Sequence, residues 1–234
     1  TSKTTGDYIL VVHDITQLRQ LNSMRRDFIS NLSHELRTPV SVIRANSETL
    51  LDGALDNKKE AKTFARAILH NSERLSVMVA DLIDLSRIEY GDLKLNIKKI
   101  DLISFMENFV TSMKSVTKKK EIEIIFKSNH YDFVKADPQA LERIMNNLVD
   151  NAFKYSEKGS IIEISTITEH QHVKVMVSDS GVGVSDEDKS HIFDRFYRTA
   201  SARASDNKGS GLGLAIVKNL TNSLNGEVGV ESKN

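Results

Sequence analysis

Several features that the sequence lacks exclude whole classes of site. The 234 residues contain no cysteine, which excludes disulfides, thiolate zinc sites and thiol nucleophiles. This suits a reducing compartment, so we expect a cytoplasmic location. Neither sign of charge is in excess, because Lys plus Arg and Asp plus Glu each total 32. The net charge therefore predicts no direct contact with nucleic acid or an anionic membrane, and any phosphate-binding site has to be local.

Long apolar runs are also missing. No stretch approaches the ~20 apolar residues that cross a bilayer, and the N-terminus has no basic segment followed by an apolar signal core. A Walker-type phosphate loop, GxxxxGK[ST], is absent as well, which disfavours a P-loop nucleotide fold. Hydrophobic residues make up 39% and charged residues 27%, which is ordinary globular usage, and the length favours two folded units.

A helical hairpin is predicted in the first part of the chain. Residues 15–51 place apolar side chains at spacings near three and four, and residues 52–57 break that pattern with turn-forming types. The second arm has a heptad seam made of Phe64, Ile68, Asn71, Leu75, Met78, Leu82 and Leu85. Such a hairpin usually completes its core by pairing with a copy of itself, so we predict a homodimeric four-helix bundle. The alternative is a monomeric hairpin packed on the rest of the chain.

After Gly91 the pattern changes to strands and helices in alternation. Strands are predicted at 93–97, 121–126, 131–134, 161–167 and 173–177, and helices at 101–118, 138–155, 189–196 and 211–224. Asp101 and the pair Asp137-Pro138 should open the first two of these helices. Sequential strands with interspersed helices indicate an α+β sandwich. We therefore expect an α+β protein with a helical hairpin followed by an α/β sandwich.

One histidine of the first helix is expected to face solvent. With about 100° per residue, and with Phe28, Leu32 and Leu36 as the buried stripe, His34 lies about 160° from the centre of that stripe. Thr38 lies one turn further on and faces the same way. Taken alone, a surface histidine on an amphipathic helix is more often an inert, solvated residue.

The surroundings of His34 nevertheless suit phosphoryl chemistry. A neutral imidazole offers one nitrogen lone pair for in-line attack on a phosphoryl group, and Glu35 beside it can take or orient the proton on the other nitrogen. Pro39 removes a backbone hydrogen bond to Glu35 and should bend the helix just below His34. We expect this bend to leave room for a partner.

Three further segments point to a nucleotide. Amides and a lysine recur with helical spacing within 138–155, where they provide oxygen ligands for a hydrated Mg²⁺ and a charge for phosphate. The turn at 179–183 offers a carboxylate for an exocyclic amine and glycines that let the backbone approach a flat ring. The glycine-rich segment 209–214 opens a helix and supplies N–H groups to an anion. Each is a weak signal alone, and a solvated helix face explains the first equally well.

Together and in this order, these segments resemble the conserved boxes of sensor histidine kinases of two-component systems, closest to the phosphate-sensing PhoR and cell-wall-sensing WalK type. Residues 28–39 resemble the phosphoacceptor H box, and residues 147–155 resemble the N box. Residues 179–183 are similar to the first glycine box, 192–198 to the F box and 209–214 to the second glycine box. Five motifs in the expected order make a chance match very rare.

The resemblance implies a domain organisation and an activity. It implies the remnant of a PAS-like sensor domain at 1–13, a dimerisation and histidine-phosphotransfer domain at 14–90 and a Bergerat-type ATP-binding domain at 91–234. It implies that ATP phosphorylates His34 and that the phosphoryl group passes to an aspartate of a response regulator, expected to be a winged-helix transcription regulator. Phosphatase activity toward that regulator and a membrane anchor in the full-length protein are also implied.

The resemblance also assigns roles to single residues. In the hairpin, His34 is the acceptor, Glu35 acts as base or orienter, and Thr38 aligns water during dephosphorylation. ATP and Mg²⁺ are the implied cofactors, and Asn151 is the implied metal ligand. The implied nucleotide-binding residues are Asn147, Asn151, Lys154, Tyr155, Asp179, Gly181, Gly183, Arg198, Gly209, Gly211, Leu212 and Gly213. Among these, Asp179 recognises the adenine amine, Tyr155 flanks the nucleotide and Arg198 reaches the terminal phosphate, while residues 199–208 form a mobile lid.

Two departures from the family pattern and two alternatives accompany this interpretation. The sequence ends at Asn234, where the family has a final strand, and the second glycine box begins Lys208-Gly209-Ser210 in place of paired glycines.

A Bergerat-fold ATPase that acts as a clamp or chaperone would also explain the nucleotide motifs. A non-catalytic or phosphatase-biased scaffold that binds a regulator through its bundle is the last alternative.

Overall fold

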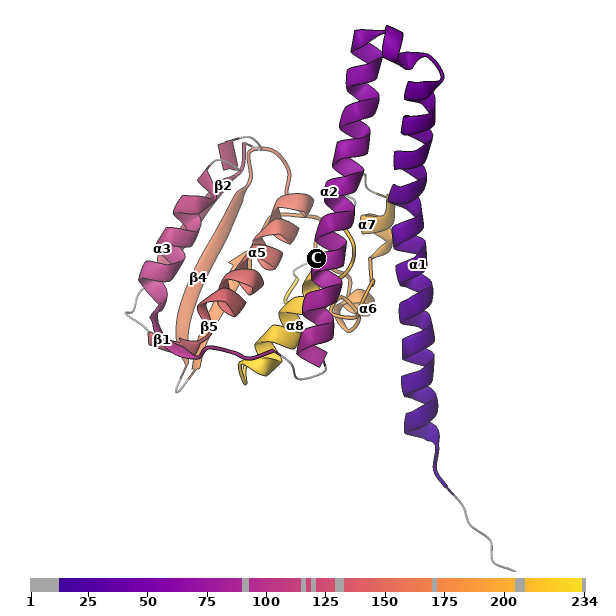
Figure 1. Cartoon of the computed structure of the whole chain (residues 1–234). Helices are drawn as coiled ribbons and strands as arrows, with labels where there is room; N and C mark the ends of the chain where they lie inside the picture. Colours follow the sequence, from indigo (N-terminus) through magenta and orange to yellow (C-terminus); the bar gives the residue numbers. More distant parts are fainter. Residues whose placement is uncertain are drawn as a thin grey trace, which may run out of the picture.

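A long helical hairpin stands beside an α/β domain (Figure 1). The computed structural model describes residues 13–89, 93–114, 117–118, 121–128, 133–169, 172–204 and 209–232. The hairpin consists of α1 (Thr16–Leu51), the short 3-10 helix η1 (Ala54–Asp56) and α2 (Lys58–Glu89). Its turn falls where the sequence predicts it. The predicted strand remnant at 8–12 lies outside the described residues. Within the described residues, no helix combines the length and the apolar character needed to cross a membrane.

Two residues of the predicted α2 seam, Met78 and Leu85, are buried, and the other five are half-buried. Met78 and Leu85 are buried in one apolar cluster with Ile144 and Ile216, which belong to that domain. The hairpin therefore packs on the rest of the chain. Asn71, the polar seam member, donates to the backbone carbonyl of its own helix, at Ala67, across 2.8 Å.

The α/β domain contains a three-stranded sheet with the order β2-β4-β5. Its strands are β2 (Glu123–Ser128), β4 (Ile161–Glu169) and β5 (His172–Ser178). β2 runs parallel to β4, and β4 runs antiparallel to β5. A separate antiparallel pair is formed by β1 (Lys98–Asp101) and β3 (Phe133–Ala136).

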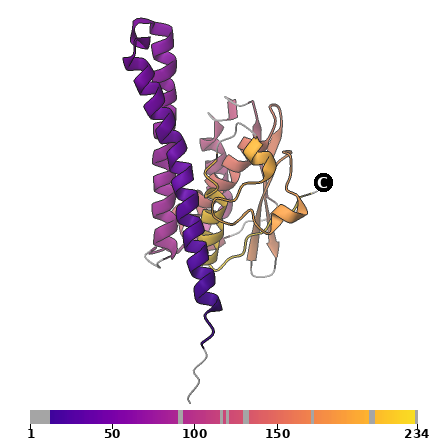
Figure 2. The same cartoon turned by 90° about the vertical axis from the view of Figure 1, so that its right-hand side faces the viewer.

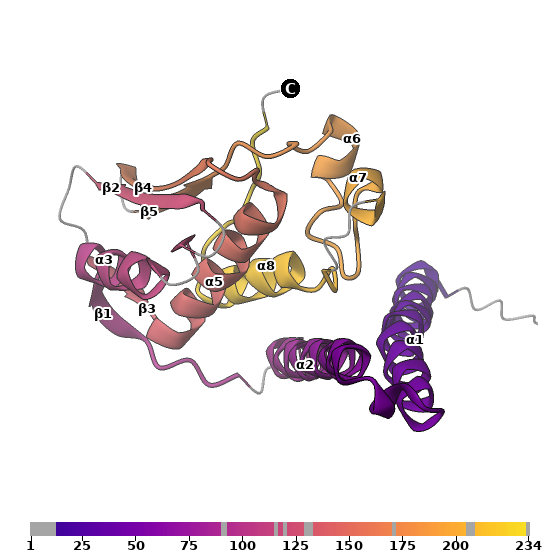
Figure 3. The ribbon, with the colours of Figure 1, turned by 90° about the horizontal axis from the view of Figure 1, so that it is seen from above.

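Two helices, α3 (Leu102–Ser112) and α5 (Pro138–Tyr155), pack against this sheet. α8 (Gly213–Ser223) packs against α5 and α2, and the short α6 (Asp186–Lys189) and α7 (Ala200–Ala204) lie in the connection before α8. Seen from above, the sheet, the helices α3, α5 and α8, then α2 and finally α1 follow one another (Figure 3). Figure 2 shows the same separation of hairpin and sheet from the side. The predicted α+β class, a helical hairpin followed by an α/β domain, is confirmed.

α5 lies between two apolar clusters. Met145 and Val149 pack toward the sheet with Ile162 and Ile164, while Ile144 faces α8 and α2. These positions recur at the three- and four-residue spacing of a helix face. As a result, α5 connects the sheet to the hairpin. Packing on two sides fixes the helix, so its remaining polar face is held in one orientation relative to the domain.

Two predicted elements are wrong. Residues 93–97 form no strand, because Leu93 and Leu95 pack against the cluster of α2 and α8, and the strand begins at Lys98, where β3 supplies hydrogen-bond partners. The short helix predicted at 189–196 is instead α6 at 186–189, which begins where the Ser185 side chain accepts from the Asp188 N–H. α1 runs without interruption through Pro39, so the bend there stays a prediction.

The N-terminus of α5 is held by Asp137, which gives a stability prediction. Its carboxylate accepts from the N–H groups of Gln139 and Ala140, and from that of Asn96 at 2.7 Å. Burial raises the pKa of Asp137, but the hydrogen bonds from Ala140, Asn96 and Gln139 outweigh it, so its pKa lies below the usual value. The ionised side chain therefore stabilises the fold above the unfolded pKa of about 4, and this contribution is lost as the pH falls through the folded pKa.

Asp137→Ala is expected to lower the free energy of unfolding by about 2 kcal/mol near neutral pH, because three N–H groups lose their acceptor. Urea unfolding of the variant and the parent should show this difference shrinking as the pH falls through the folded pKa of Asp137. Asp137→Asn keeps a good capping side chain without the charge, so its cost should be smaller and should not vary with pH in this way. A cost for Asp137→Ala that is equal at every pH would contradict the prediction.

Candidate functional site

His34 and Thr38 are both exposed, as the helical periodicity predicts. The Thr38 hydroxyl donates to the backbone carbonyl of His34 at 3.4 Å, one turn before it. The imidazole therefore stands on the outer side of α1 while the following turn of the helix stays intact. The imidazole is therefore accessible from solvent, as a nucleophile that attacks an external group has to be.

Glu35 points to α2 and not along α1. Its Oε2 accepts from Nη2 of Arg74 at 3.0 Å, so the carboxylate bridges the two arms of the hairpin. Sequence reasoning missed Arg74, because it lies 39 positions away along the chain. Its place in the seam region, next to Leu75, is the one signal that would have pointed to a contact across the hairpin.

The polar residues predicted on α5 share a half-exposed face. Asn147, Asn151, Lys154 and Tyr155 are all partly accessible. Nδ2 of Asn147 donates to the backbone carbonyl of Arg143 at 2.8 Å, and Nζ of Lys154 lies 3.0 Å from a carboxylate oxygen of Asp150. This face offers amide oxygens and a cation, which are the groups that a hydrated metal and a phosphate require.

The second glycine box lies directly against this face. A Cβ at Gly213 would stand 2.7 Å from Oδ1 of Asn147, so only glycine lets the N-terminus of α8 come this close. Gly211 adopts φ +72, and a Cβ there would meet the Phe196 backbone at 2.7 Å. The Gly211 carbonyl in turn accepts from the Phe196 N–H at 2.9 Å. The two boxes 192–198 and 209–214, separate in sequence, are therefore packed backbone to backbone.

The first glycine box reaches the C-terminal end of α5. Oδ1 of Asp179 accepts from the Gly181 N–H at 2.8 Å. A Cβ at Gly181 would lie 2.8 Å from both Asp179 Oδ1 and the Tyr155 carbonyl oxygen. Asp179 and Tyr155 are thus brought together, and the Asp179 carboxylate is exposed. An exposed carboxylate is a suitable hydrogen-bond acceptor for an amino group on a flat base.

The remaining predicted nucleotide residues differ in their surroundings. Arg198 donates to the Ala202 carbonyl in α7, so the F box and the start of the predicted lid are joined. Gly209 and Gly183 have no side chain to offer and Gly183 is exposed. Leu212 is fully buried among the residues of α8 and α2. Its side chain is part of the core, and its backbone N–H donates to the Ser210 hydroxyl at 3.3 Å.

The α/β domain is attached to the hairpin by charged contacts that sequence reasoning also missed. The Arg143 guanidinium on α5 lies 2.5 Å from Asp81 and 3.2 Å from Asp84, both on α2. Burial raises the pKa of the Asp81 carboxyl, although the Arg143 charge opposes this. Removing Arg143 would leave a buried carboxylate without its partner, which is the costly way to break such a pair.

An aromatic contact links α1 to the α/β domain. The rings of Phe28 and Phe196 are 5.6 Å apart, and the Arg195 guanidinium lies 5.5 Å from the Phe28 ring centre. Phe28 precedes His34 by six residues, which is about 9 Å along a helix axis. The F box thus contacts the H-box helix less than two turns from the exposed imidazole.

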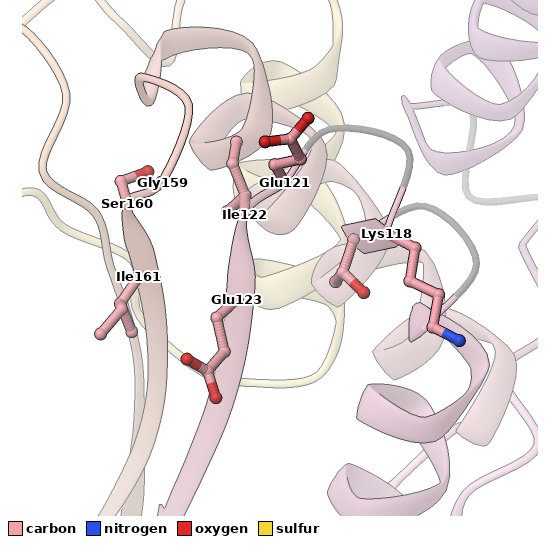
Figure 4. Close-up of a pocket in the computed structure, with 8 residues that line it drawn as sticks. Lys118, Glu121, Ile122, Glu123, Gly159, Ser160 and Ile161 are labelled. Carbon is pink, nitrogen blue, oxygen red and sulfur yellow. The ribbon is translucent and has the colours of Figure 1, made fainter.

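A hollow in the described part of the chain lies elsewhere. It measures about 480 Å³ and is lined by Thr117, Lys118, Glu121, Ile122, Glu123, Gly159, Ser160 and Ile161 (Figure 4). The backbones of its two walls are joined, because the Gly159 N–H donates to the Glu121 carbonyl at 2.8 Å. None of the predicted nucleotide-binding residues lines it.

Two protein families match the two parts of the chain. The family described as "His Kinase A (phospho-acceptor) domain" matches residues 24–91. The family described as "Histidine kinase-, DNA gyrase B-, and HSP90-like ATPase" matches residues 136–234. The first match contains His34 and most of α1, and the second contains α5, the glycine boxes and α8.

Curated relatives align over nearly the whole chain. The sensor-like histidine kinase SenX3 of Mycobacterium tuberculosis is 35% identical over 225 residues, which cover 96% of this chain and 55% of SenX3. The sensor histidine kinase WalK of Bacillus subtilis is 33% identical over 227 residues, which cover 96% of this chain and 37% of WalK. The chain therefore spans about half, or less, of the length of these relatives.

Solved structures share the arrangement of hairpin and α/β domain. The histidine kinase AdeS of Acinetobacter baumannii has a TM-score of 0.66 and 26% identity, over 81% of this chain and 86% of AdeS. ShkA in complex with AMPPNP has a TM-score of 0.63 and 25% identity, over 88% and 43%. ThkA in complex with TrrA has the same fold, with a TM-score of 0.72 at 23% identity over 89% and 57%. With the phosphoacceptor and ATPase families matched in this order, the chain belongs to the sensor histidine kinases.

Proposed function

We propose that this chain is the kinase core of a sensor: ATP bound to the α/β domain phosphorylates His34, and the phosphoryl group passes to an aspartate of a response regulator. The observation that carries the proposal is that one chain combines an exposed histidine on a helical hairpin with a polar α5 face against a glycine loop. The match to an ATPase family and the likeness to ShkA with AMPPNP support ATP as the donor.

The phosphates are proposed to bind where α5 meets the N-terminus of α8. Gly213 brings the first N–H groups of α8 beside Asn147, and such groups bind anions because they have no partner within the helix. Lys154 adds a positive charge from the same face of α5. Arg198, attached to α7 through the Ala202 carbonyl, is the proposed contact to the terminal phosphate.

The adenine is proposed to bind between Asp179 and Tyr155. The exposed Asp179 carboxylate accepts a hydrogen bond from the exocyclic amine, and the Tyr155 ring flanks the base. Gly181 allows this approach because a side chain there would collide with Asp179 and with the Tyr155 backbone. Gly183 borders the same region in the proposal. The predicted mobile lid at 199–208 lies partly outside the described residues and stays a prediction.

Mg²⁺ is the proposed metal, with Asn151 as its protein ligand. In the described ranges, no group of three or more His, Asp or Glu side chains is placed to hold a metal, and Mg²⁺ needs none, because it retains waters and phosphate oxygens as ligands. The amide oxygen of Asn151 on a half-exposed face fits that demand. When bound, the ion neutralises charge on the phosphates.

The proposed transfer is an in-line displacement. One ring nitrogen of neutral His34 attacks the γ-phosphorus of ATP, the bond to the bridging oxygen breaks, and ADP leaves with the electron pair. The proton on the other ring nitrogen goes to Glu35, through a water or directly. Positioning and charge neutralisation provide most of the acceleration.

The homodimer and the regulator are parts of the same proposal. Large apolar side chains stay exposed along the hairpin, among them Ile29, Val40, Leu51, Leu55, Leu69, Val77, Val79 and Ile83. A second hairpin would cover such a surface. Thr38, exposed one turn after His34, is proposed to align water when the regulator is dephosphorylated. The winged-helix class of the regulator, the membrane anchor and the cytoplasmic location stay predictions.

Radiolabelled ATP tests the proposed function. Incubation of the chain with γ-labelled ATP and Mg²⁺ should give a labelled protein whose phosphoryl group is lost in acid and kept in alkali, as a phosphorylated nitrogen requires. A second candidate, an ATPase that acts as a clamp, has support in the HSP90-like part of the matched family description. Steady ATP hydrolysis without any labelled protein would favour that candidate and contradict ours.

A further inference from the structure

An ion pair crosses the hairpin at the level of the proposed phosphoryl acceptor. Nη2 of Arg74 on α2 donates to Oε2 of Glu35 on α1 at 3.0 Å, and Glu35 directly follows His34. The two side chains are 14% and 28% exposed. A charged hydrogen bond that is largely shielded from water is stronger and better fixed than one at the surface.

Packing alone is a weak reason for an arginine at this position. Nε of Arg74 is buried and has no hydrogen-bond partner among the described residues. A guanidinium removed from water with part of its donors unpaired costs free energy. Apolar side chains of similar volume often replace buried ion pairs with no loss of stability. A role in chemistry therefore explains Arg74 better than a role in the core.

Helix geometry defines what that role is. Successive residues leave an α-helix about 100° apart, so His34 faces solvent while Glu35 faces α2. A glutamate has three rotatable bonds, and without an anchor its carboxylate would sample many positions relative to the imidazole. Arg74 holds Oε2 of Glu35. Because both oxygens belong to one planar carboxylate, the same hydrogen bond also orients Oε1. The Arg74 charge also offsets the Glu35 charge, which would otherwise repel a phosphoryl group on His34.

We propose that Arg74 is a positioning residue for the phosphorylation of His34, acting by fixing the Glu35 carboxylate so that Oε1 accepts the proton that the imidazole releases. This inference rests on the proposed function. It predicts that Arg74 affects the rate of transfer and not the binding of ATP, because Arg74 belongs to the hairpin. It also predicts that Arg74 has no effect once Glu35 is unable to take a proton.

A double-mutant cycle on the full chain tests this. Initial rates of His34 labelling are measured over a range of ATP concentrations for the parent, Arg74→Met, Glu35→Gln and the double variant. Arg74→Met should lower kcat by about tenfold to a hundredfold with KM for ATP unchanged. The double variant should be no slower than Glu35→Gln, whereas effects that multiply would show that Arg74 acts on its own. Arg74→Lys, which keeps the charge but loses the planar fork, should have an intermediate kcat.

Arg66→Met is the matched control, because Arg66 is an exposed arginine on the same helix. Its kcat should equal that of the parent. Equal rates for Arg74→Met and Arg66→Met would overturn the proposal, as would a multiplicative double variant or a raised KM. If Arg74→Met does not fold, Arg74→Lys goes through the same cycle and is judged by the same outcomes. A parent chain that is never labelled would overturn the proposed function itself, and this inference with it.

Discussion

His34→Gln is expected to abolish labelling of the chain by ATP, with a fall of at least about 10³-fold in the rate. Glutamine fills a similar volume but has no ring nitrogen with a lone pair, so no acid-labile phosphoryl group can form on it. Because His34 is exposed, the substitution should leave the fold and the affinity for ATP unchanged. The measurement is the initial rate of label incorporation at saturating ATP.

His70 provides the matched control for this variant. It is an exposed histidine on α2, so His70→Gln makes the same chemical change on the same hairpin without touching the proposed acceptor. His70→Gln should be labelled like the parent. Equal labelling of His34→Gln and the parent would show that the acceptor is another residue.

Asn151→Asp is expected to lower the labelling rate on the order of 10²-fold and to weaken the binding of ATP with Mg²⁺. A carboxylate has no N–H to donate, and it puts a negative charge beside the phosphates. Two like charges about 4 Å apart repel by about 4 kcal/mol at an effective dielectric constant of about 20. A repulsion of about 2.7 kcal/mol is already enough to weaken binding a hundredfold. Titration of ATP with and without Mg²⁺ measures the change.

Asn146→Asp is the control for the same change of charge on the same helix. Asn146 precedes Asn147 on α5, is half-buried and lies outside the predicted nucleotide set. Its variant should bind ATP about as well as the parent. Unchanged ATP affinity in Asn151→Asp would contradict the assignment of this residue, and a parent chain without affinity for ATP would contradict the whole nucleotide site.

Local signals predicted some elements to the residue. α5 runs from Pro138 to Tyr155 as expected, because Asp137 caps the helix through its own neighbours and Pro138 suits the first turn. The exposure of His34 and Thr38 follows from helical periodicity alone. In contrast, Leu93 and Leu95 alternate like a strand, but their partners are α2 and α8. Pairing with a distant segment decides whether such a run becomes a strand.

The order of the motifs and the composition determined that this chain is a helical hairpin followed by a nucleotide-binding α/β domain, since caps, turns and hydrophobic periods act over a few residues. The tertiary structure alone decided that Glu35 is held by Arg74 and that Arg143 joins Asp81, across 39 and 62 positions of sequence. Neither pair leaves a periodic trace in the sequence. Contacts of this kind depend on which helix faces meet, and that is set by the packing of both apolar clusters together.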